Sequence, residues 1–163
     1  MRNGKYNSGF SLIEVLIAIV LIGFAMASLL AANGAFTKAN GAGTDLSTAE
    51  FLIEQIREFS TLLPVIDPET EAAVFGPESG EVLANYDDLD DFDGANFSPP
   101  IGADRSPLTD LAAFSQQITV ENVNASNFEQ AVADHGSPFV RVTVRVYLNS
   151  REISSERWLR ARY

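Results

Sequence analysis

The chain has 163 residues, of which 46% are hydrophobic and 20% are charged, and its formal net charge is −11. So negative a chain is not expected to bind nucleic acid through a surface that neutralises phosphates. The sequence contains no cysteine and one histidine, His135. Disulfides, thiolate zinc sites, cysteine nucleophiles and multi-histidine metal sites are therefore excluded.

The N-terminal part of the chain is strongly apolar. Residues 15–37 contain no charged side chain, and a run of this length can cross a bilayer as a helix. The preceding segment, residues 1–9, is hydrophilic, and its only charges are Arg2 and Lys5. Positive charge retains this end in the cytoplasm. We therefore expect a single-pass membrane protein whose C-terminal part lies outside the cytoplasm.

Glu14 is the one charged residue at the edge of this apolar helix. A carboxylate at the centre of a membrane helix costs roughly 2.5–3.5 kcal/mol, and less near the interface. Two interpretations follow. Glu14 either marks the membrane edge or has a positively charged partner within the bilayer.

The residues around Glu14 have a characteristic order. A short basic leader ends in Gly9, Phe10 follows, Glu14 is the fifth residue after Gly9, and an apolar helix continues from there. This combination resembles the cleavage and methylation motif of type IV prepilins and type II secretion pseudopilins. The chain is most similar to a minor or modification-type pilin, with a looser likeness over residues 49–57.

The resemblance implies a processing and assembly pathway. A prepilin peptidase would cleave between Gly9 and Phe10 and methylate the new amino terminus of Phe10. Glu14 would then pair with the terminal amine of a neighbouring subunit, which supplies the missing positive partner. The implied partners are the peptidase, other pilin or pseudopilin subunits and an inner-membrane assembly platform. The implied location is the inner membrane, and then a pilus or pseudopilus.

A second apolar pattern has helical spacing. It consists of Leu46, Ala49, Leu52, Ile53, Ile56, Phe59 and Leu63. A helix ending near Leu62 is predicted, because residues before a proline such as Pro64 avoid helical geometry. Glycines between Asn33 and Gly43 leave the continuity of the helix open. The chain thus divides into a leader (1–9), a helical spine (10–63, with 10–32 in the membrane) and a globular domain (64–163).

The first part of the globular domain is rich in proline and aspartate. Its acidic cluster comprises Asp87, Asp88, Asp90, Asp91 and Asp93. An EF-hand is excluded, because Gly94 at the sixth position would place Leu89 at the first ligand position. Two alternatives remain: an irregular calcium site, or a solvated loop held to the core by Tyr86, Leu89 and Phe92.

The sequence pattern near the C-terminal end predicts β-strands. Residues 139–148 alternate strictly, with valines on one face and Arg141, Thr143 and Arg145 on the other. Residues 115–123 and 152–160 are the expected partner strands. The fold class is therefore α+β and pilin-like: a long N-terminal helix, membrane-spanning in its lower half, packed on a small antiparallel sheet.

The C-terminal arginines allow two interpretations. They either form a solvated strand face or meet the acidic loop of another subunit. Asp134, His135 and Ser137 are sequence neighbours, which rarely adopt the geometry of a catalytic triad. We therefore expect a structural subunit with no catalytic residues. The alternatives are an adhesin displayed on a filament and a membrane-anchored binding module.

Overall fold

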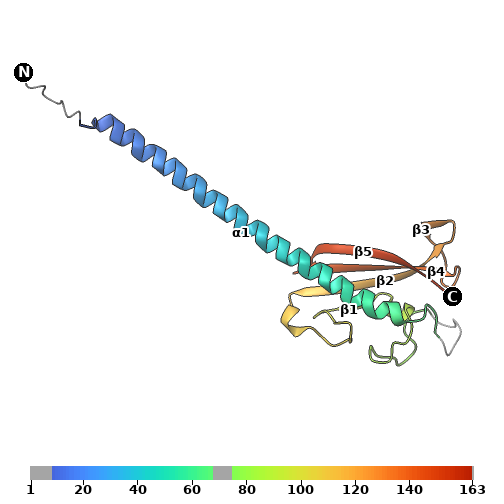
Figure 1. Ribbon diagram of the computed structural model, residues 1–163. Helices are drawn as coiled ribbons and strands as arrows, with labels where there is room; N and C mark the ends of the chain where they lie inside the picture. Colours follow the sequence, from blue (N-terminus) through green and yellow to red (C-terminus); the bar gives the residue numbers. More distant parts are fainter. Residues whose placement is uncertain (1–8, 68–74, 163) are drawn as a thin grey trace, which may run out of the picture. The chain divides into compact units, whose positions relative to one another are not determined.

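A computed structural model describes residues 9–67 and 75–162. The elements follow in the order α1 (Leu12–Leu62), η1 (Asp90–Phe92), β1 (Asn96–Phe97), η2 (Thr109–Leu111), β2 (Phe114–Asn124), β3 (Asn127–Ala131), β4 (Phe139–Leu148) and β5 (Arg151–Ala161) (Figure 1). One long N-terminal helix packs on a C-terminal antiparallel sheet, so the predicted α+β class is confirmed. Residues 1–8, which include Arg2, Lys5 and most of the predicted leader, lie outside the described residues.

Helix α1 runs without interruption for 51 residues, about 77 Å at 1.5 Å per residue. The stretch from Asn33 to Gly43 is helical throughout, although each glycine costs about 1 kcal/mol relative to alanine. The apolar helix before this stretch and the amphipathic helix after it extend helical structure through it, because helix extension is cooperative. The helix ends at Leu62, close to the proline at position 64, as predicted.

The chain divides into two compact units, Met1–Gly43 and Thr44–Tyr163. The described residues of the first unit are all exposed, including its large apolar side chains. The second unit contains the C-terminal part of α1, the long connection and the whole sheet.

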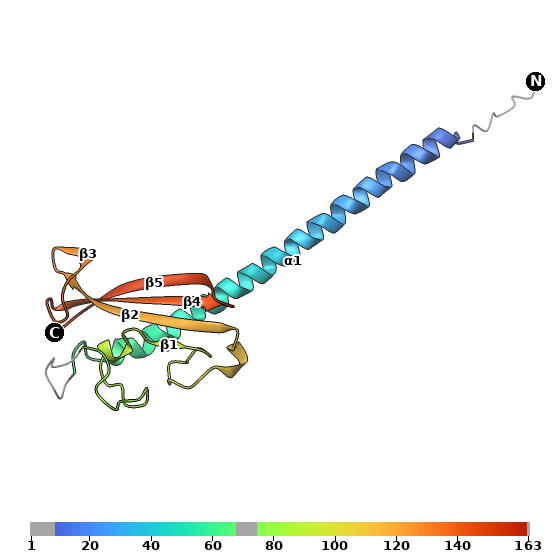
Figure 2. The same cartoon turned by 180° about the vertical axis from the view of Figure 1, so that it is seen from behind.

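The sheet has the strand order β1-β2-β4-β5, and β3 pairs with the end of β2 (Figure 2). The central strands are antiparallel, with Ile118 opposite Val144 and Val142 opposite Trp158. A two-residue turn joins β4 to β5, and both of its residues, Asn149 and Ser150, have positive φ angles of 49° and 66°. Such turns match the twist of a hairpin.

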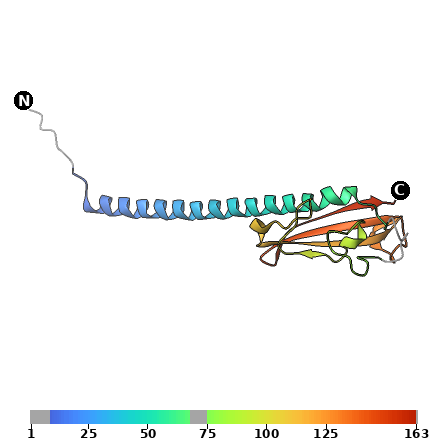
Figure 3. The same ribbon diagram turned by 90° about the horizontal axis from the view of Figure 1, so that it is seen from below.

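The core of the second unit lies between one face of the sheet and the apolar face of α1 (Figure 3). Residues three or four positions apart on α1 pack against alternate residues of the strands. The central buried residues are Leu52, Ile53 and Ile56 from α1, and Val140, Val142, Val144 and Val146 from β4. Leu46 was predicted to belong to the apolar helix face, but it is exposed, and the buried face begins at Ala49.

A polar side chain on β2 links three parts of this unit. Gln116 on β2 is fully buried, and its Nε2 donates to the carbonyl oxygen of Leu52 at 2.8 Å. Its Oε1 accepts from the backbone N–H of Ile101 at 2.8 Å. Gln116 therefore links the helix, the sheet and the long connection.

Candidate functional site

The predicted cleavage point lies just before α1. Gly9 and Phe10 precede the helix, and Phe10 is 89% exposed. Ser11 is the single residue between Phe10 and the first helical residue, Leu12. The Gly9–Phe10 bond thus lies in non-helical backbone.

Glu14 and Ser11 cap the start of the helix together. The Glu14 carboxylate oxygen Oε2 accepts from the Ser11 backbone N–H at 2.8 Å and from the Ser11 hydroxyl at 2.9 Å. The Glu14 backbone N–H in turn points to the Ser11 hydroxyl oxygen at 3.4 Å. This reciprocal arrangement is a capping box, and it satisfies N–H groups that have no partner within the helix. Both Ser11 bonds fall on the same oxygen, Oε2.

The helix that follows can cross a membrane by its length and composition, with a mean hydropathy of 2.8 over its most apolar window. That window is entirely exposed. Apolar side chains such as Leu12, Phe24 and Leu30 are therefore expected to be shielded from water by lipid or by other helices.

The acidic loop is folded into the second unit. Leu89 and Phe92 are buried in the core, and Tyr86 packs against it, as predicted. The prediction that this loop is solvated is wrong for Asp88, Asp90 and Asp91, because these residues are buried. These aspartates are buried because they are sequence neighbours of Leu89 and Phe92, whose side chains lie in the core.

Backbone N–H groups satisfy most of the buried carboxylates. Asp91 Oδ2 accepts from the N–H groups of Asp87 and Asp88, and Asp88 Oδ1 accepts from Asp91. Asp90 Oδ2 accepts from Gly76 at 3.1 Å. Among the described residues, Asp90 Oδ1 is buried without a hydrogen-bond partner.

The carboxyl groups of Asp88 and Asp90 lie against one another. Burial, followed by the charge of Asp90, raises the pKa of Asp88 to about 7. Burial also raises the pKa of Asp90. Burial raises the pKa of Asp91 to about 6, and the charge of Asp88 adds to this effect. Close carboxylates in a dry environment favour a shared proton over two charges.

Asp91 also belongs to a second group of carboxylates, together with the partly buried Glu78 and Glu81. One oxygen from each of Glu78, Glu81 and Asp91 lies within 4.8 Å of the others. The hydrogen bond to the Glu81 carboxyl group raises the pKa of Glu78 to about 7. Of the predicted calcium ligands only Asp91 belongs to this group, and Asp93 instead accepts from the Val120 N–H at 2.8 Å. Calcium binding by Asp87, Asp88, Asp90, Asp91 and Asp93 stays a prediction.

The C-terminal arginines are not all solvated. Arg141 has a side chain only 13% exposed and forms an ion pair with Glu121 at 2.9 Å. Arg160 donates to the carbonyl oxygens of Ser60 and Leu63 at the end of α1. Arg57 on the helix pairs with Glu156 on β5 and lies over the Trp158 ring. The solvated-face interpretation is therefore wrong for Arg141 and Arg160.

Two of the three neighbouring residues considered as a triad, His135 and Ser137, have other partners. The His135 backbone N–H donates to Asn122 Oδ1 at 2.7 Å, and its ring meets Phe75 edge-on at 5.6 Å. The Ser137 hydroxyl oxygen accepts from the Phe139 N–H.

Comparison with known proteins supports the assignment of the N-terminal segment. Residues 4–30 match the family model described as the prokaryotic N-terminal methylation motif. No curated protein and no solved structure matches the chain. The matched segment contains Gly9, Phe10 and Glu14 and leads into a long apolar helix packed on an antiparallel sheet. The N-terminal segment thus carries a prokaryotic N-terminal methylation motif, and the long helix packed on an antiparallel sheet is a pilin-like arrangement.

Sequence reasoning did not identify Ser11, Glu78 or Glu81 as site residues. Ser11 could have been found, because Ser-x-x-Glu before an apolar run is the sequence pattern of a capping box. Glu78 and Glu81 could not, because their approach to Asp91 depends on how the loop folds.

Proposed function

We propose that this chain is a filament subunit, cleaved between Gly9 and Phe10, methylated at Phe10 and then assembled through α1. The single observation that supports the proposal best is the motif match over residues 4–30, with Glu14 at the start of an exposed apolar helix. Before assembly the subunit is held in the inner membrane with its C-terminal unit outside the cytoplasm. This orientation is supported by the positive charges of Arg2 and Lys5, because basic residues beside a membrane helix favour the cytoplasmic side.

Glu14 supplies the register between subunits. Its Oε2 already accepts two hydrogen bonds from Ser11, so Oε1 is the oxygen left to receive the charged amine of Phe10 on a neighbour. A buried carboxylate is stabilised when such an opposite charge reaches it. Apolar side chains along α1 then pack against those of adjacent helices.

The finer assignment is to a minor subunit of a type IV pilus or a type II secretion pseudopilus. No proline occurs before position 64, whereas many main pilins carry a helix-breaking proline in this region. Quantifying this chain against the other subunits of isolated filaments tests the assignment. A chain that makes up most of the filament would contradict it.

Processing is tested by intact mass and N-terminal sequencing of the chain produced in a host with an active prepilin peptidase. We expect a chain beginning with methylated Phe10, and the full-length chain in a host lacking the peptidase. The Glu14→Ala variant should be cleaved but excluded from filaments. An uncleaved chain in the competent host would refute the proposal, and normal incorporation of Glu14→Ala would refute the role of Glu14.

A further inference from the structure

Strand β5 forms one edge of the sheet over its whole length. The strand order ends at β5, and no strand among residues 9–67 and 75–162 pairs with its far side (Figure 2). β5 has 11 residues, whereas β1, on the opposite edge, has 2. Native proteins usually shorten or cover such an edge, because its backbone groups can pair with another strand. The long edge of β5 is therefore a candidate interaction surface.

The pairing with β4 shows which backbone groups of β5 face outward. The Arg162 N–H donates to the Pro138 carbonyl oxygen at 2.7 Å, and the same register continues to Ser154 opposite Val146. Bonded and non-bonded pairs alternate in an antiparallel ladder, so the even-numbered residues of this stretch bond β4. The outward groups belong to Ser155, Arg157, Leu159 and Ala161. In the described part of the chain, no backbone hydrogen bond outside the sheet reaches them.

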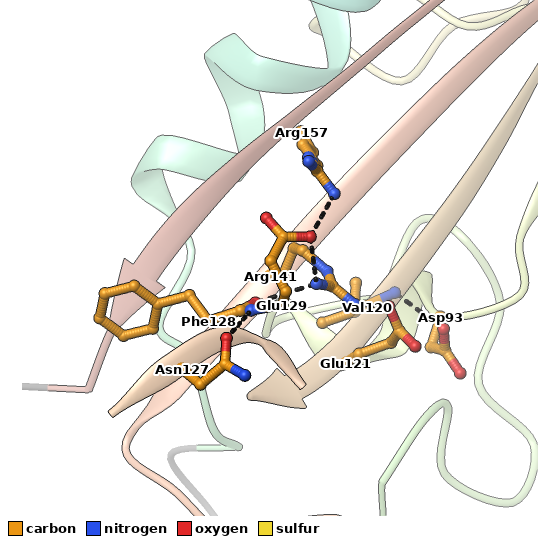
Figure 4. A network of polar contacts seen from close by, with 8 residues as sticks. All are labelled: Asp93, Val120, Glu121, Asn127, Phe128, Glu129, Arg141 and Arg157. Atoms are coloured by element: carbon orange, nitrogen blue, oxygen red, sulfur yellow. Dashed lines mark hydrogen bonds and ion pairs between the residues drawn. The ribbon is translucent and has the colours of Figure 1, made fainter. Parts of the chain in front are cut away.

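Two charged side chains in the middle of this edge, Glu156 and Arg157, are already paired within the chain. Glu156 forms an ion pair with Arg57 on α1. A carboxylate oxygen of Glu129 on β3 lies 2.8 Å from an Arg157 guanidinium nitrogen and 3.8 Å from one of Arg141 (Figure 4). Charges on an edge strand discourage pairing with another strand. Here the charges are neutralised, so this obstacle is weakened.

A hollow of about 190 Å³ lies beside the edge, between β3 and β5. Its walls include two apolar side chains, Phe128 and Leu159, which are 38% and 42% exposed. Arg141 and Arg157 also line the hollow, and Glu129 balances them. Exposed apolar side chains that lie together mark contact surfaces. An uncharged, apolar side chain therefore fits this hollow better than a charged one.

We propose that the outward edge of β5 binds an extended strand of a different filament subunit, which adds to the sheet. The added strand bonds the outward N–H and C=O groups of residues 155–161. Directly opposite residues share one face of a sheet, so the residue opposite Leu159 places an apolar side chain beside the hollow. In strand addition the backbone bonds supply affinity, and the pockets for alternate side chains supply specificity.

The occupant is a different subunit for two reasons. The C-terminal part of α1 lies lengthwise over the sheet, so an antiparallel copy of β5 would bring an α1 that points the opposite way (Figure 3). Two chains anchored in one membrane with the same orientation cannot adopt that arrangement. In addition, a minor subunit has other subunits as its neighbours. The inference thus rests on the proposed function, because it names a contact that this subunit makes in the filament.

Amide hydrogen exchange tests whether the edge is occupied. The full chain in detergent micelles is compared with the same chain in isolated filaments. In micelles the Ser155, Arg157 and Leu159 amides should exchange fast, while β4 protects those of Glu156 and Trp158. In filaments the three outward amides should exchange about tenfold more slowly or less. Equal exchange in both states, or protection already present in micelles, would overturn the inference.

Proline at position 155 tests the backbone contact directly. Ser155→Pro removes an N–H that faces away from β4, where an edge strand tolerates proline. Protection of Arg157 and Leu159 in filaments should be lost, whereas Ser155→Ala keeps the N–H and should retain it. Protection of the Glu156 and Trp158 amides in micelles shows that the variant is folded. A folded variant excluded from filaments that admit Ser155→Ala would equally support the contact.

A second variant acts through the side chain and leaves the backbone unchanged. Leu159→Lys adds a positive charge to the hollow beside Arg141 and Arg157 and should also abolish protection of Ser155 in filaments. Val82→Lys makes a comparable change at a position that is 59% exposed and lies outside the sheet, and it should have no effect. Full protection in both Ser155→Pro and Leu159→Lys would overturn the inference.

Photo-crosslinking in the filament-producing host identifies the occupant. A photoreactive phenylalanine analogue replaces Ser155, and the control chain carries it at Ala112, an exposed position before β2. An adduct to another filament subunit, formed only from position 155, is expected. An adduct to a second copy of this chain or to lipid would overturn the assignment.

The outcomes separate this inference from the proposed function. A cleaved chain that is present in filaments with its outward amides unprotected would overturn strand addition alone. Failure of cleavage in the competent host would overturn the proposed function instead.

Discussion

Ser11 and Glu14 hold one another at the first turn of α1, with the Glu14 carboxylate 2.8 Å from the Ser11 backbone nitrogen and 2.9 Å from its hydroxyl oxygen. The glutamate expected to join subunits thus also organises the start of its own helix. The two roles use the same carboxyl group, so the capping contact fixes where the group can meet a neighbour.

Replacing Ser11 should separate these roles. Ser11→Ala removes the capping hydroxyl and is expected to destabilise the first helical turn by about 1 kcal/mol. Amide hydrogen exchange of the full chain in detergent micelles should show faster exchange at Glu14 and Val15. The Ser28→Ala control removes a hydroxyl bonded within the helix, to the Phe24 carbonyl, and should leave those amides protected. Unchanged exchange in Ser11→Ala would contradict the capping role.

The Asp88–Asp90 pair should make stability depend on pH. The pKa of Asp88 is about 7 in the folded chain, against an ordinary value of 3.8, so the folded state holds the proton more tightly. The contribution of this pair to the free energy of unfolding should therefore be highest below about pH 4, fall between pH 4 and pH 7, and level off above. Urea unfolding across this range, with a chelator present, provides the measurement.

Asp90→Asn should remove much of this dependence. The amide keeps an acceptor for the Gly76 N–H and offers a donor to Asp88, so the variant should be more stable at pH 8 by about 1–2 kcal/mol. Asp87→Asn, at an exposed neighbouring position, should change little. A wild-type profile that is flat from pH 4 to pH 7 would show that the pair does not share a proton.

Arg160 should matter more than its place near the chain end suggests. Its guanidinium binds the Ser60 and Leu63 carbonyl oxygens, which the helix itself leaves without donors. Arg160→Ala should lower the free energy of unfolding by about 1–2 kcal/mol. Arg162→Ala is the control, because that residue is exposed. Equal stability of the two variants would count against the cap.

Gln116 offers a test of the buried polar link. Gln116→Leu leaves the Ile101 N–H buried without its acceptor and should cost about 1–3 kcal/mol. Gln117→Leu changes the next residue, on the open face, and should have a smaller effect. Chemical denaturation of both variants at one pH gives the comparison, and a neutral Gln116→Leu would mean that the loop finds another acceptor.

The elements that could be predicted from sequence are those with a long periodic pattern. The valines of 139–148 alternate strictly, and the observed β4 has the same bounds. Strands β2 and β5 extend the predicted segments by one residue at each end. β1 has only two residues, and β3 is exposed along its whole length, so neither carries an apolar alternation.

The burial of Asp88, Asp90 and Asp91 could not be predicted, because aspartate is normally exposed. It results from the loop as a whole. Leu89 and Phe92 enter the core, and Arg105 donates to the carbonyl oxygens of Leu83 and Tyr86, which holds the preceding turn in place. No local pattern encodes contacts between residues about twenty positions apart.

The bond from Arg160 to Ser60 joins residues 100 positions apart, near the two ends of the second unit. During synthesis the helix end emerges first, and Arg160, which donates to its carbonyl oxygen, is made almost last. Until β5 has formed, the unit lacks this cap, the Arg57–Glu156 pair and one strand of its sheet. A chain truncated before residue 150 would keep the membrane helix yet leave the second unit unfinished. Such a chain should be an easy target for proteases, which would remove incomplete subunits before assembly.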